Sequence, residues 1–401
     1  MVLNVPNLIS SKMKFLILIN LITVLNLYGQ IYSKLWGVNG ESWTPESRLL
    51  DFSEVGFEKG DKAIPEWAVK INVMKFGAKG DGKHDDREAI IKAIEACPPK
   101  GAVYFPDGAY LISDWIKVNK SQIVLRGQSR EKTILYFPKG LNEIRPMPTK
   151  NNSGLSTSEY SWGYGFFLFE SESYMGIENF TFKFPDKPYP GHFKENGYNG
   201  IQFQKGAKNC WAVNLKFYNC DSGIYANSSS YITIQDTVFD AYKGRGNMTG
   251  HHGITAKRSH HILVNEFDFK VKMYHELSLE FGSNMCVWSN GKGIQLHFDH
   301  HQPPPNHPYK NLFTNIDVGD PKLLWRNNAK GSTDGEVYWN IKASKRIPYP
   351  VNSATRNNTF VAFQGVGKPA PNKNNYVEII PNDKVLPKNI YEAQLNKRRE
   401  N

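Results

Sequence analysis

The chain has 401 residues, 40% of them apolar, with 33 glycines and 23 prolines, which allows a large buried core and excludes a small disulfide-stapled scaffold or a disordered chain. Its 49 basic and 38 acidic residues give a net charge of +11, accompanied by 20 Tyr, 23 Phe and 9 Trp, a combination suited to binding an anionic polymer such as nucleic acid or acidic glycan. The 4 cysteines show neither CxxC pairs nor Cys/His finger spacing, so the sequence predicts buried thiols and excludes a structural zinc module.

The amino terminus has the features of a signal peptide. Two lysines precede an apolar run from Phe15 to Leu27, and the small residue Gly29 follows it, an order typical of secretory signals. The run is shorter than the about 20 apolar residues that a membrane span requires. We therefore expect residues 1–30 to be a cleaved signal and the mature protein to be periplasmic or extracellular. Export argues against nucleic acid as the partner, and the sequence predicts no membrane insertion.

An extension over residues 31–70 precedes a predicted helix that begins near Asp85 and Asp86. One apolar face of this helix is formed by Ala89, Ile90, Ala93, Ile94 and Cys97. An aspartate in the first turn is a favourable helix cap, and Asp81-Gly82 is a turn pair. We interpret these acidic residues as structural rather than as a metal site, and we expect the helix to close the end of a stacked β-structure. The first strand is expected at 101–106 and a later one at 123–127.

Between residues 165 and 269 the sequence repeats. In four units a glycine is followed 16 or 17 residues later by a phenylalanine: Gly165 and Phe182, Gly200 and Phe217, Gly223 and Phe239, Gly253 and Phe269. A unit this short cannot bury its apolar face alone. The repeats therefore predict a parallel β-solenoid, in which stacked units share one continuous core. Insertions at 185–198, 242–250 and 302–310 fall between units, where loops usually border a binding groove. Residues 384–401 are expected to form a tail with a short helix at 389–399.

A family resemblance rests on the segment before the repeats. The runs NVMKFGAKGDG at 72–82 and VYFPDGAY at 103–110, with the helix start between them, strongly resemble the opening of the pectate-lyase-like superfamily. The resemblance implies an all-β fold, a single-stranded right-handed parallel β-helix with an N-terminal capping helix, here over residues 71–383, and an extracellular carbohydrate ligand. Members include polysaccharide lyases, polygalacturonase-like hydrolases, epimerases and phage tailspikes, so the reaction stays open.

Histidines are concentrated in the middle coils. Nine of the 11 lie between His251 and His307, and imidazole is the side chain that titrates nearest to neutral pH. An alignment of the inward residues Phe166, Ile201, Ile224 and Ile254 places five polar residues in one column: Tyr164, Asn199, Ser222, His252 and, provisionally, His275. Neighbouring strands lie about 4.8 Å apart, so such a column rises by nearly one sugar ring per coil. It predicts contacts to successive sugars.

Hydrolysis is the second choice for the reaction. The run GHHG at 250–253 is similar to the Gly-His-Gly segment of polygalacturonases, where histidine lines the cleft, and the resemblance applies to His252. Those hydrolases need a separated pair of carboxylates. Asp221-Ser222-Gly223 offers only one acid, so the sequence favours another chemistry.

Elimination at a uronic acid needs a base for the C5 proton, groups that neutralise the carboxylate, and an acid for the departing O4. We assign the base to His252 and the acid to His275 or Tyr274. The expected carboxylate clamp consists of Lys272, Arg245 and Asn199, since arginine holds a planar carboxylate in a bidentate fork.

Further substrate contacts are expected from residues 295–301. Gln295, His297, Asp299 and His301 alternate with the apolar Ile294, Leu296 and Phe298, so they point away from the core. We interpret them as substrate contacts, although His-x-Asp-x-His on one strand face is also a ligand set for a divalent ion. Glu280 and Lys292 complete the expected substrate-binding set.

The sequence thus predicts an exported enzyme that performs β-elimination at a uronic acid of an anionic glycan, either as a polysaccharide lyase or as a dehydratase of a terminal uronic acid. A glycoside hydrolase and a non-catalytic glycan-binding protein are the alternatives. No cofactor is firmly implied, and a divalent cation such as calcium stays an option. The oligomeric state is open.

Overall fold

A computed structural model describes residues 29–148, 158–321, 324–325, 333–350, 355–367 and 374–400. Most of the expected signal peptide lies outside these residues. Among the described residues, no helix is long and apolar enough to cross a membrane. The four cysteines are buried free thiols, as predicted.

Two parallel sheets form the body of the molecule. The large sheet follows the order β2 (Val69–Asn72), β4 (Gly101–Phe105), β7 (Ile123–Gly127), β10 (Met175–Lys183), β12 (Trp211–Tyr218), β14 (Thr233–Asp240), β16 (Leu263–Phe269), β18 (Val287–Ser289), β21 (Leu312–Asp317), β22 (Val337–Lys342), β24 (Thr359–Phe363) and β26 (Tyr376–Glu378), with β3 (Asp81–Asp85), β5 (Gly108–Leu111), β8 (Thr133–Tyr136) and β19 (Lys292–Gly293) alongside. The small sheet contains β6 (Ile116–Val118), β9 (Phe167–Glu170), β11 (Asn199–Gln204), β13 (Ser222–Asn227), β15 (His252–Lys257), β17 (His275–Glu280) and β20 (Phe298–His300).

The remaining elements are short. Two strand pairs, β1 (Ile31–Tyr32) with β27 (Val385–Leu386) and β23 (Ile347–Pro348) with β25 (Gly365–Val366), stand apart from the two sheets. The α-helices are α2 (Arg87–Ala96), α3 (Leu141–Ile144) and α4 (Ile390–Glu400). Within the described parts of the chain, 3-10 turns lie at Phe57–Gly60, Val73–Phe76, Glu159–Trp162 and Lys243–Arg245.

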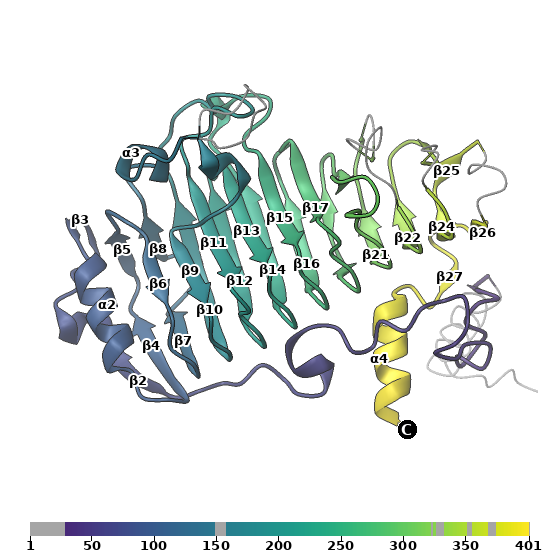
Figure 1. The fold of residues 1–401 in the computed structure, drawn as a ribbon, viewed down its shortest axis with the longest axis horizontal. Helices are drawn as coiled ribbons and strands as arrows, with labels where there is room; N and C mark the ends of the chain where they lie inside the picture. Colours follow the sequence, from purple (N-terminus) through teal and green to yellow (C-terminus); the bar gives the residue numbers. More distant parts are fainter. Residues whose placement is uncertain are drawn as a thin grey trace, which may run out of the picture.

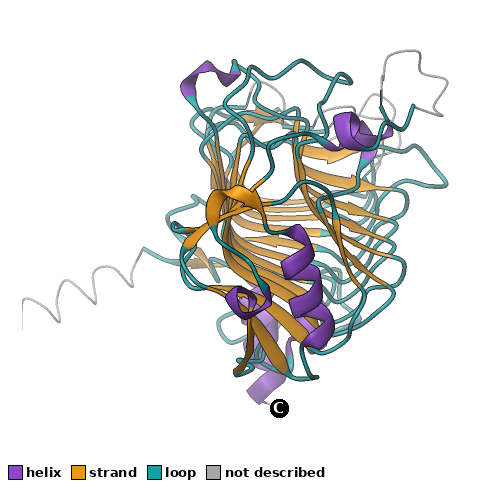
Figure 2. Cartoon of the chain, turned by 90° about the vertical axis from the view of Figure 1, so that its left-hand side faces the viewer, coloured by secondary structure: helices purple, strands orange, loops and turns teal. Residues whose placement is uncertain are grey.

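The strands are stacked as successive coils of a right-handed parallel β-helix, which confirms the expected fold class (Figure 1). The middle coils add strands to both sheets, whereas the coils after β20, where the structure describes them, extend the large sheet rather than the small one. The apolar side chains of successive coils form one continuous core. Helix α2 covers the first coils, as the view along the stack shows (Figure 2). Its residues Ile90, Ala93 and Ile94 are buried in that core.

Two sequence expectations about the first coils need correction. The sheet begins at β2, ahead of the strand that was expected to be first. The expected aspartate contact to the helix start is made by Asp85, whose Oδ1 accepts a hydrogen bond from the Arg87 N–H at 3.2 Å. Asp86 stands at the N-cap position of α2, but its carboxylate accepts hydrogen bonds from the backbone of Lys79 and Gly80 rather than from the helix. It therefore fixes the preceding turn. Asp81 accepts hydrogen bonds from the backbone of Lys83 and His84, as expected of an aspartate in a turn.

The repeats determine the register of the large sheet. Phe182, Phe217, Phe239 and Phe269 are paired in register, and their rings stack with centroids 5.0, 5.1 and 4.2 Å apart. The glycine of each later unit leaves room for the phenylalanine ring of the same unit. A Cβ on Gly223 would lie 2.3 Å from the Phe239 ring, and a Cβ on Gly253 would lie 2.4 Å from the Phe269 ring. The predicted repeat unit is confirmed for these coils.

The first repeat is displaced by one residue from the predicted alignment. Ile201 pairs with Phe167 rather than Phe166, so Tyr164 does not belong to the polar column. The rest of the column is confirmed, since Asn199, Ser222, His252 and His275 are in register.

Both ends of the described chain pack on the outer face of the large sheet. Residues Phe52 and Val55 of the extension and Ile390 and Tyr391 of α4 share an apolar cluster with strand residues such as Trp339. The expected helix near the C-terminus is present as α4. Because β1 pairs with β27, the extension and the tail form one structure.

Candidate active site

A break in strand alternation places the histidines on the outer face of the small sheet. Ile254 faces the core, and a Cβ on Gly253 would meet the core ring of Phe269, so two consecutive residues face inward. His252 consequently lies on the same side as Thr255, whose Oγ1 is 3.3 Å from His252 Nδ1. Strict alternation would have turned the His252 ring into the core.

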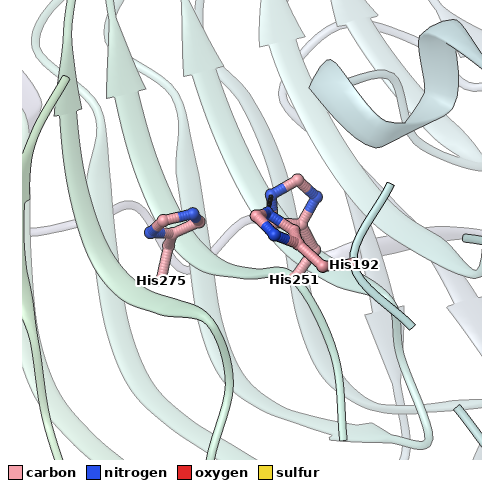
Figure 3. Close-up of side chains that lie close together, drawn as sticks. All are labelled: His192, His251 and His275. Carbon is pink, nitrogen blue, oxygen red and sulfur yellow. Dashed lines mark hydrogen bonds between the residues drawn. The ribbon is translucent and has the colours of Figure 1, made fainter. Parts of the chain in front are cut away.

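Five imidazoles form a contiguous group, here called the histidine cluster: His192, His251, His252, His275 and His301. Ring centroids are 4.4 Å apart for His192–His251, 4.1 Å for His251–His252, 4.9 Å for His252–His275 and 4.7 Å for His275–His301. They come from the 185–198 loop, from β15 and the residue before it, from the start of β17, and from the residue after β20. Figure 3 shows three of them, His192, His251 and His275. The cluster therefore joins segments that are far apart in sequence.

His252 has the environment of a neutral base. Its side chain is buried, and Nε2 has no hydrogen-bond partner among the described residues. The tautomer with the proton on Nδ1 donates it toward Thr255 and leaves the lone pair of Nε2 unpaired. Burial, reinforced by the charges of His251 and His275, lowers the pKa of His252 well below its ordinary value, so the ring is uncharged at neutral pH.

Two buried carboxylates orient other members of the cluster. His275 Nδ1 lies 2.7 Å from Asp299 Oδ2, and His251 Nδ1 lies 3.2 Å from Glu195 Oε1. Burial alone would raise the pKa of Glu195, but the neighbouring His251 and hydrogen bonds from Ser161 and Tyr189 outweigh it and hold that pKa at about 2. Both carboxylates thus fix an imidazole ring in place.

Two members of the expected carboxylate clamp are engaged elsewhere. Arg245 is buried, and its guanidinium donates to Asp221 Oδ1 at 2.8 Å and to the carbonyls of Thr249 and Lys187. Asn199 donates to the carbonyls of Tyr160 and Gly163 at 2.9 and 2.8 Å. Their donors hold loops above the small sheet, so neither forms the predicted clamp.

The other two predicted cations differ in position. Lys292 lies on β19 of the large sheet, 3.5 Å from Asp268, and is exposed, so it cannot reach the histidine cluster. Lys272 is half-buried, and its positive charge contributes to lowering the pKa of Asp320. Tyr274, by contrast, belongs to the site: its ring stacks on His192 with a centroid distance of 4.3 Å.

Residues 295–301 separate into two environments. His297 is buried against Glu276, with Nδ1 2.6 Å from Oε2, so it does not make the expected substrate contact. Asp299 and His301 join the cluster, and His301 is half-buried with Nε2 3.5 Å from Ser278 Oγ. Ile294 was expected to face the core but is exposed. Glu280 is buried and lies 3.4 Å from Lys257 Nζ.

Sequence reasoning missed His192 and Glu195. Both lie in the 185–198 insertion, which was predicted to border a groove, and its length was the only signal that pointed to them. Three-residue groups with geometry suited to a metal ion are present in the described residues: His192, His251 and His275, and His275, Asp299 and His301.

Comparisons with known proteins gave one family match and several solved structures of low identity. The family described as "Rhamnogalacturonase A/epimerase, pectate lyase-like" matches residues 70–269. A polygalacturonase from Erwinia carotovora is 12% identical, with 81% of this chain and 98% of that chain covered and a TM-score of 0.49.

Curated relatives match over shorter stretches. "Plasmin and fibronectin-binding protein A" of Streptococcus pneumoniae is 30% identical over 206 residues, 50% of this chain and 24% of the relative. "Alginate lyase 7" of Azotobacter vinelandii is 34% identical over 100 residues, 23% of this chain and 12% of the relative. The chain thus spans a quarter or less of the length of these two relatives. The match over residues 70–269 and the stacked parallel coils show that the chain belongs to the pectate-lyase-like, rhamnogalacturonase A/epimerase family of carbohydrate-active β-helix proteins.

Proposed function

We propose that this protein catalyses β-elimination at a uronic acid residue of an anionic glycan, with the histidine cluster as its active site. The observation that carries the proposal is the uncharged, buried imidazole of His252, whose Nε2 is unpaired among the described residues. An acceptor of this kind is what the removal of a weakly acidic C–H proton requires.

The reaction balances with two proton transfers. The base takes the proton from C5, that electron pair forms the C4=C5 double bond, and the C4–O4 bond breaks. An acid supplies a proton to the departing O4. If O4 belongs to a glycosidic bond, the chain is cut; if it is a hydroxyl at a chain end, water leaves.

His252 Nε2 is the base in this scheme and Tyr274 is the acid. Of the two predicted acids, His275 is buried, whereas Tyr274 is half-buried beside His192 and therefore more accessible to a substrate. Half-buried side chains in or beside the cluster include His192, Phe193, Trp162, Tyr274 and His301. A substrate therefore meets side chains of this set first.

The state of the carboxylates favours elimination over hydrolysis. Glycosidases need one carboxyl group to protonate the leaving oxygen and a second to act as base or nucleophile. Here Glu195, Asp221 and Asp299 are each bound by a buried partner: His251, Arg245 and His275. No pair of uncommitted acids flanks the described cluster.

The ultraviolet absorbance of an unsaturated uronate tests the proposal. With a panel of uronate polymers and oligomers, we expect the wild-type protein to generate this signal and His252→Gln to lower the rate by about 10²–10⁴-fold. His84→Gln, at an exposed position outside the cluster, is the matched control and retains full activity.

Other products would overturn the proposal. Reducing ends without the absorbance signal would establish hydrolysis, and binding without either product would establish a non-catalytic glycan-binding protein. Full elimination activity in His252→Gln would remove the base assignment.

Export is part of the proposal. We expect the mature protein from the native host to begin near residue 30, which mass spectrometry of its N-terminal peptide measures. An intact residue 1–30 segment on the active protein would contradict it.

A further inference from the structure

Three imidazoles bring one nitrogen each into a common space, and the proposed proton transfers do not use them. One nitrogen from each of His192, His251 and His275 lies within 4.8 Å of the other two. His192 Nε2 and His251 Nε2 are only 2.9 Å apart, and the centroids of His192 and His275 are 5.6 Å apart (Figure 3). The rings come from a loop and from two neighbouring coils.

Buried carboxylates stand behind two of the three rings. Glu195 Oε1 lies 3.2 Å from His251 Nδ1, and Asp299 Oδ2 lies 2.7 Å from His275 Nδ1. Histidines that bind metals almost always donate their second N–H to a carboxylate or carbonyl, which fixes the tautomer and the ring orientation. His275 has this arrangement with Asp299. Glu195 is a charged neighbour of His251 Nδ1 without hydrogen-bond geometry, and His251 Nε2 faces His192 Nε2.

The donor set indicates the kind of ion. Three neutral imidazoles suit zinc and related transition metals, whereas calcium takes oxygen ligands. At Zn–N distances of about 2.0–2.1 Å, tetrahedral ligand nitrogens are about 3.3 Å apart, close to the His192–His251 separation. A hydrogen bond between two imidazoles explains the short His192–His251 distance. The convergence of a third imidazole nitrogen on the same space is the feature that indicates a metal site.

We propose that His192, His251 and His275 bind a divalent transition metal, with zinc the best fit, and that its remaining coordination position accepts an oxygen of the substrate carboxylate. The second part rests on the proposed function. Elimination requires positive charge beside the uronate carboxylate, and Arg245, the predicted source, is bound to Asp221. A metal held by these three histidines supplies that charge within the cluster.

Metal binding is measured on chelator-treated protein titrated with Zn²⁺ by calorimetry and with Co²⁺ by visible absorbance. We expect one ion per chain and a Co²⁺ spectrum of tetrahedral type. His192→Ala, in a half-buried loop position, should abolish stoichiometric binding. Glu195→Gln should weaken it by about 10–100-fold. Circular dichroism and thermal unfolding of each variant confirm that it is folded.

His301→Ala is the matched control, because His301 belongs only to the alternative group with His275 and Asp299. It should retain binding. If His301→Ala abolishes binding while His192→Ala does not, the assignment of ligands is wrong. If the wild-type protein binds neither ion stoichiometrically, the metal site itself is overturned.

The elimination assay separates this inference from the proposed function. A chelated protein that eliminates as fast as the zinc-loaded protein overturns the carboxylate role of the metal and leaves elimination intact. Stoichiometric zinc binding through His192 without elimination on any substrate overturns the proposed function and leaves the metal site intact.

Discussion

Arg245 and Asp221 illustrate at the residue scale how a predicted functional group became a structural one. Both side chains are fully buried, and the guanidinium lies 2.8 Å from Asp221 Oδ1. Removing one partner of a buried pair leaves an uncompensated charge, which typically costs 3–5 kcal/mol. We therefore expect Arg245→Met to lower the free energy of unfolding by about 3–5 kcal/mol, measured by urea denaturation.

The matched control is the exposed pair of Lys292 and Asp268. Lys292→Met should change the free energy of unfolding by less than about 1 kcal/mol, because water screens the interaction. If Arg245→Met proves as stable as Lys292→Met, the buried pair does not have the structural role described here.

A second residue-scale prediction concerns His261, outside the histidine cluster. Burial, with the neighbouring His260 in support, lowers the pKa of His261 from 6.5 to about 4. Between these values the unfolded chain binds a proton that the folded chain does not, so the free energy of unfolding falls as pH decreases from 6.5 to 4. Urea midpoints measured across this range should fall less in His261→Asn than in the wild type. Equal slopes for the two proteins would contradict the prediction.

At the scale of the strand, a glycine in the small sheet leaves space for a phenylalanine ring from the large sheet. Gly253 leaves room for the Phe269 ring, and a Cβ there would lie 2.4 Å from both the ring and the Glu276 carbonyl oxygen. The carbonyl is backbone and cannot move without disturbing the sheet. We expect Gly253→Ala to destabilise the protein by about 1–3 kcal/mol, by analogy with overpacked cores, as measured by thermal unfolding.

Gly253→Ala has a functional consequence as well. Gly253 is the position where alternation breaks, so displacing it moves the adjacent His252 ring. The elimination rate of the variant should therefore fall at temperatures where it is still folded. An unchanged rate and an unchanged melting temperature would show that the strand tolerates the Cβ.

Regular units were readily predictable from the sequence at this scale. The apolar residues Ile201, Ile224 and Ile254 repeat in register because strands stacked in a solenoid must place like residues above one another. The first coil was misaligned by one residue because both Phe166 and Phe167 are buried, so hydrophobicity could not distinguish them. In a β-strand such a shift exchanges the two faces.

At the scale of the whole molecule, the two ends of the chain stabilise the same surface. Gln394 of α4 accepts a hydrogen bond from the Phe52 backbone N–H and donates to the Leu50 carbonyl, at 3.0 and 2.8 Å. Ending the chain at residue 388 removes these contacts together with buried Ile390 and Tyr391. We expect a lower melting temperature and faster proteolysis within residues 31–60.

Gln394→Ala is the matched control for this truncation. It removes the two hydrogen bonds but keeps the apolar side chains of α4, so it should cost about 1–2 kcal/mol, less than the truncation does. A truncated protein with wild-type protease resistance would show that the extension is held without α4.

The sequence by itself determined the coil repeat, the capping helix and the family, because each short unit has an apolar face that only stacking can bury. It also placed His252 and His275 in one column. Only the tertiary structure decided that His192 and Glu195 complete the cluster and that Arg245, Lys292 and His297 do not, since their partners depend on loop paths and register. His192 and His251 lie 59 residues apart in the sequence, and yet their Nε2 atoms are 2.9 Å apart, a proximity that no local pattern encodes.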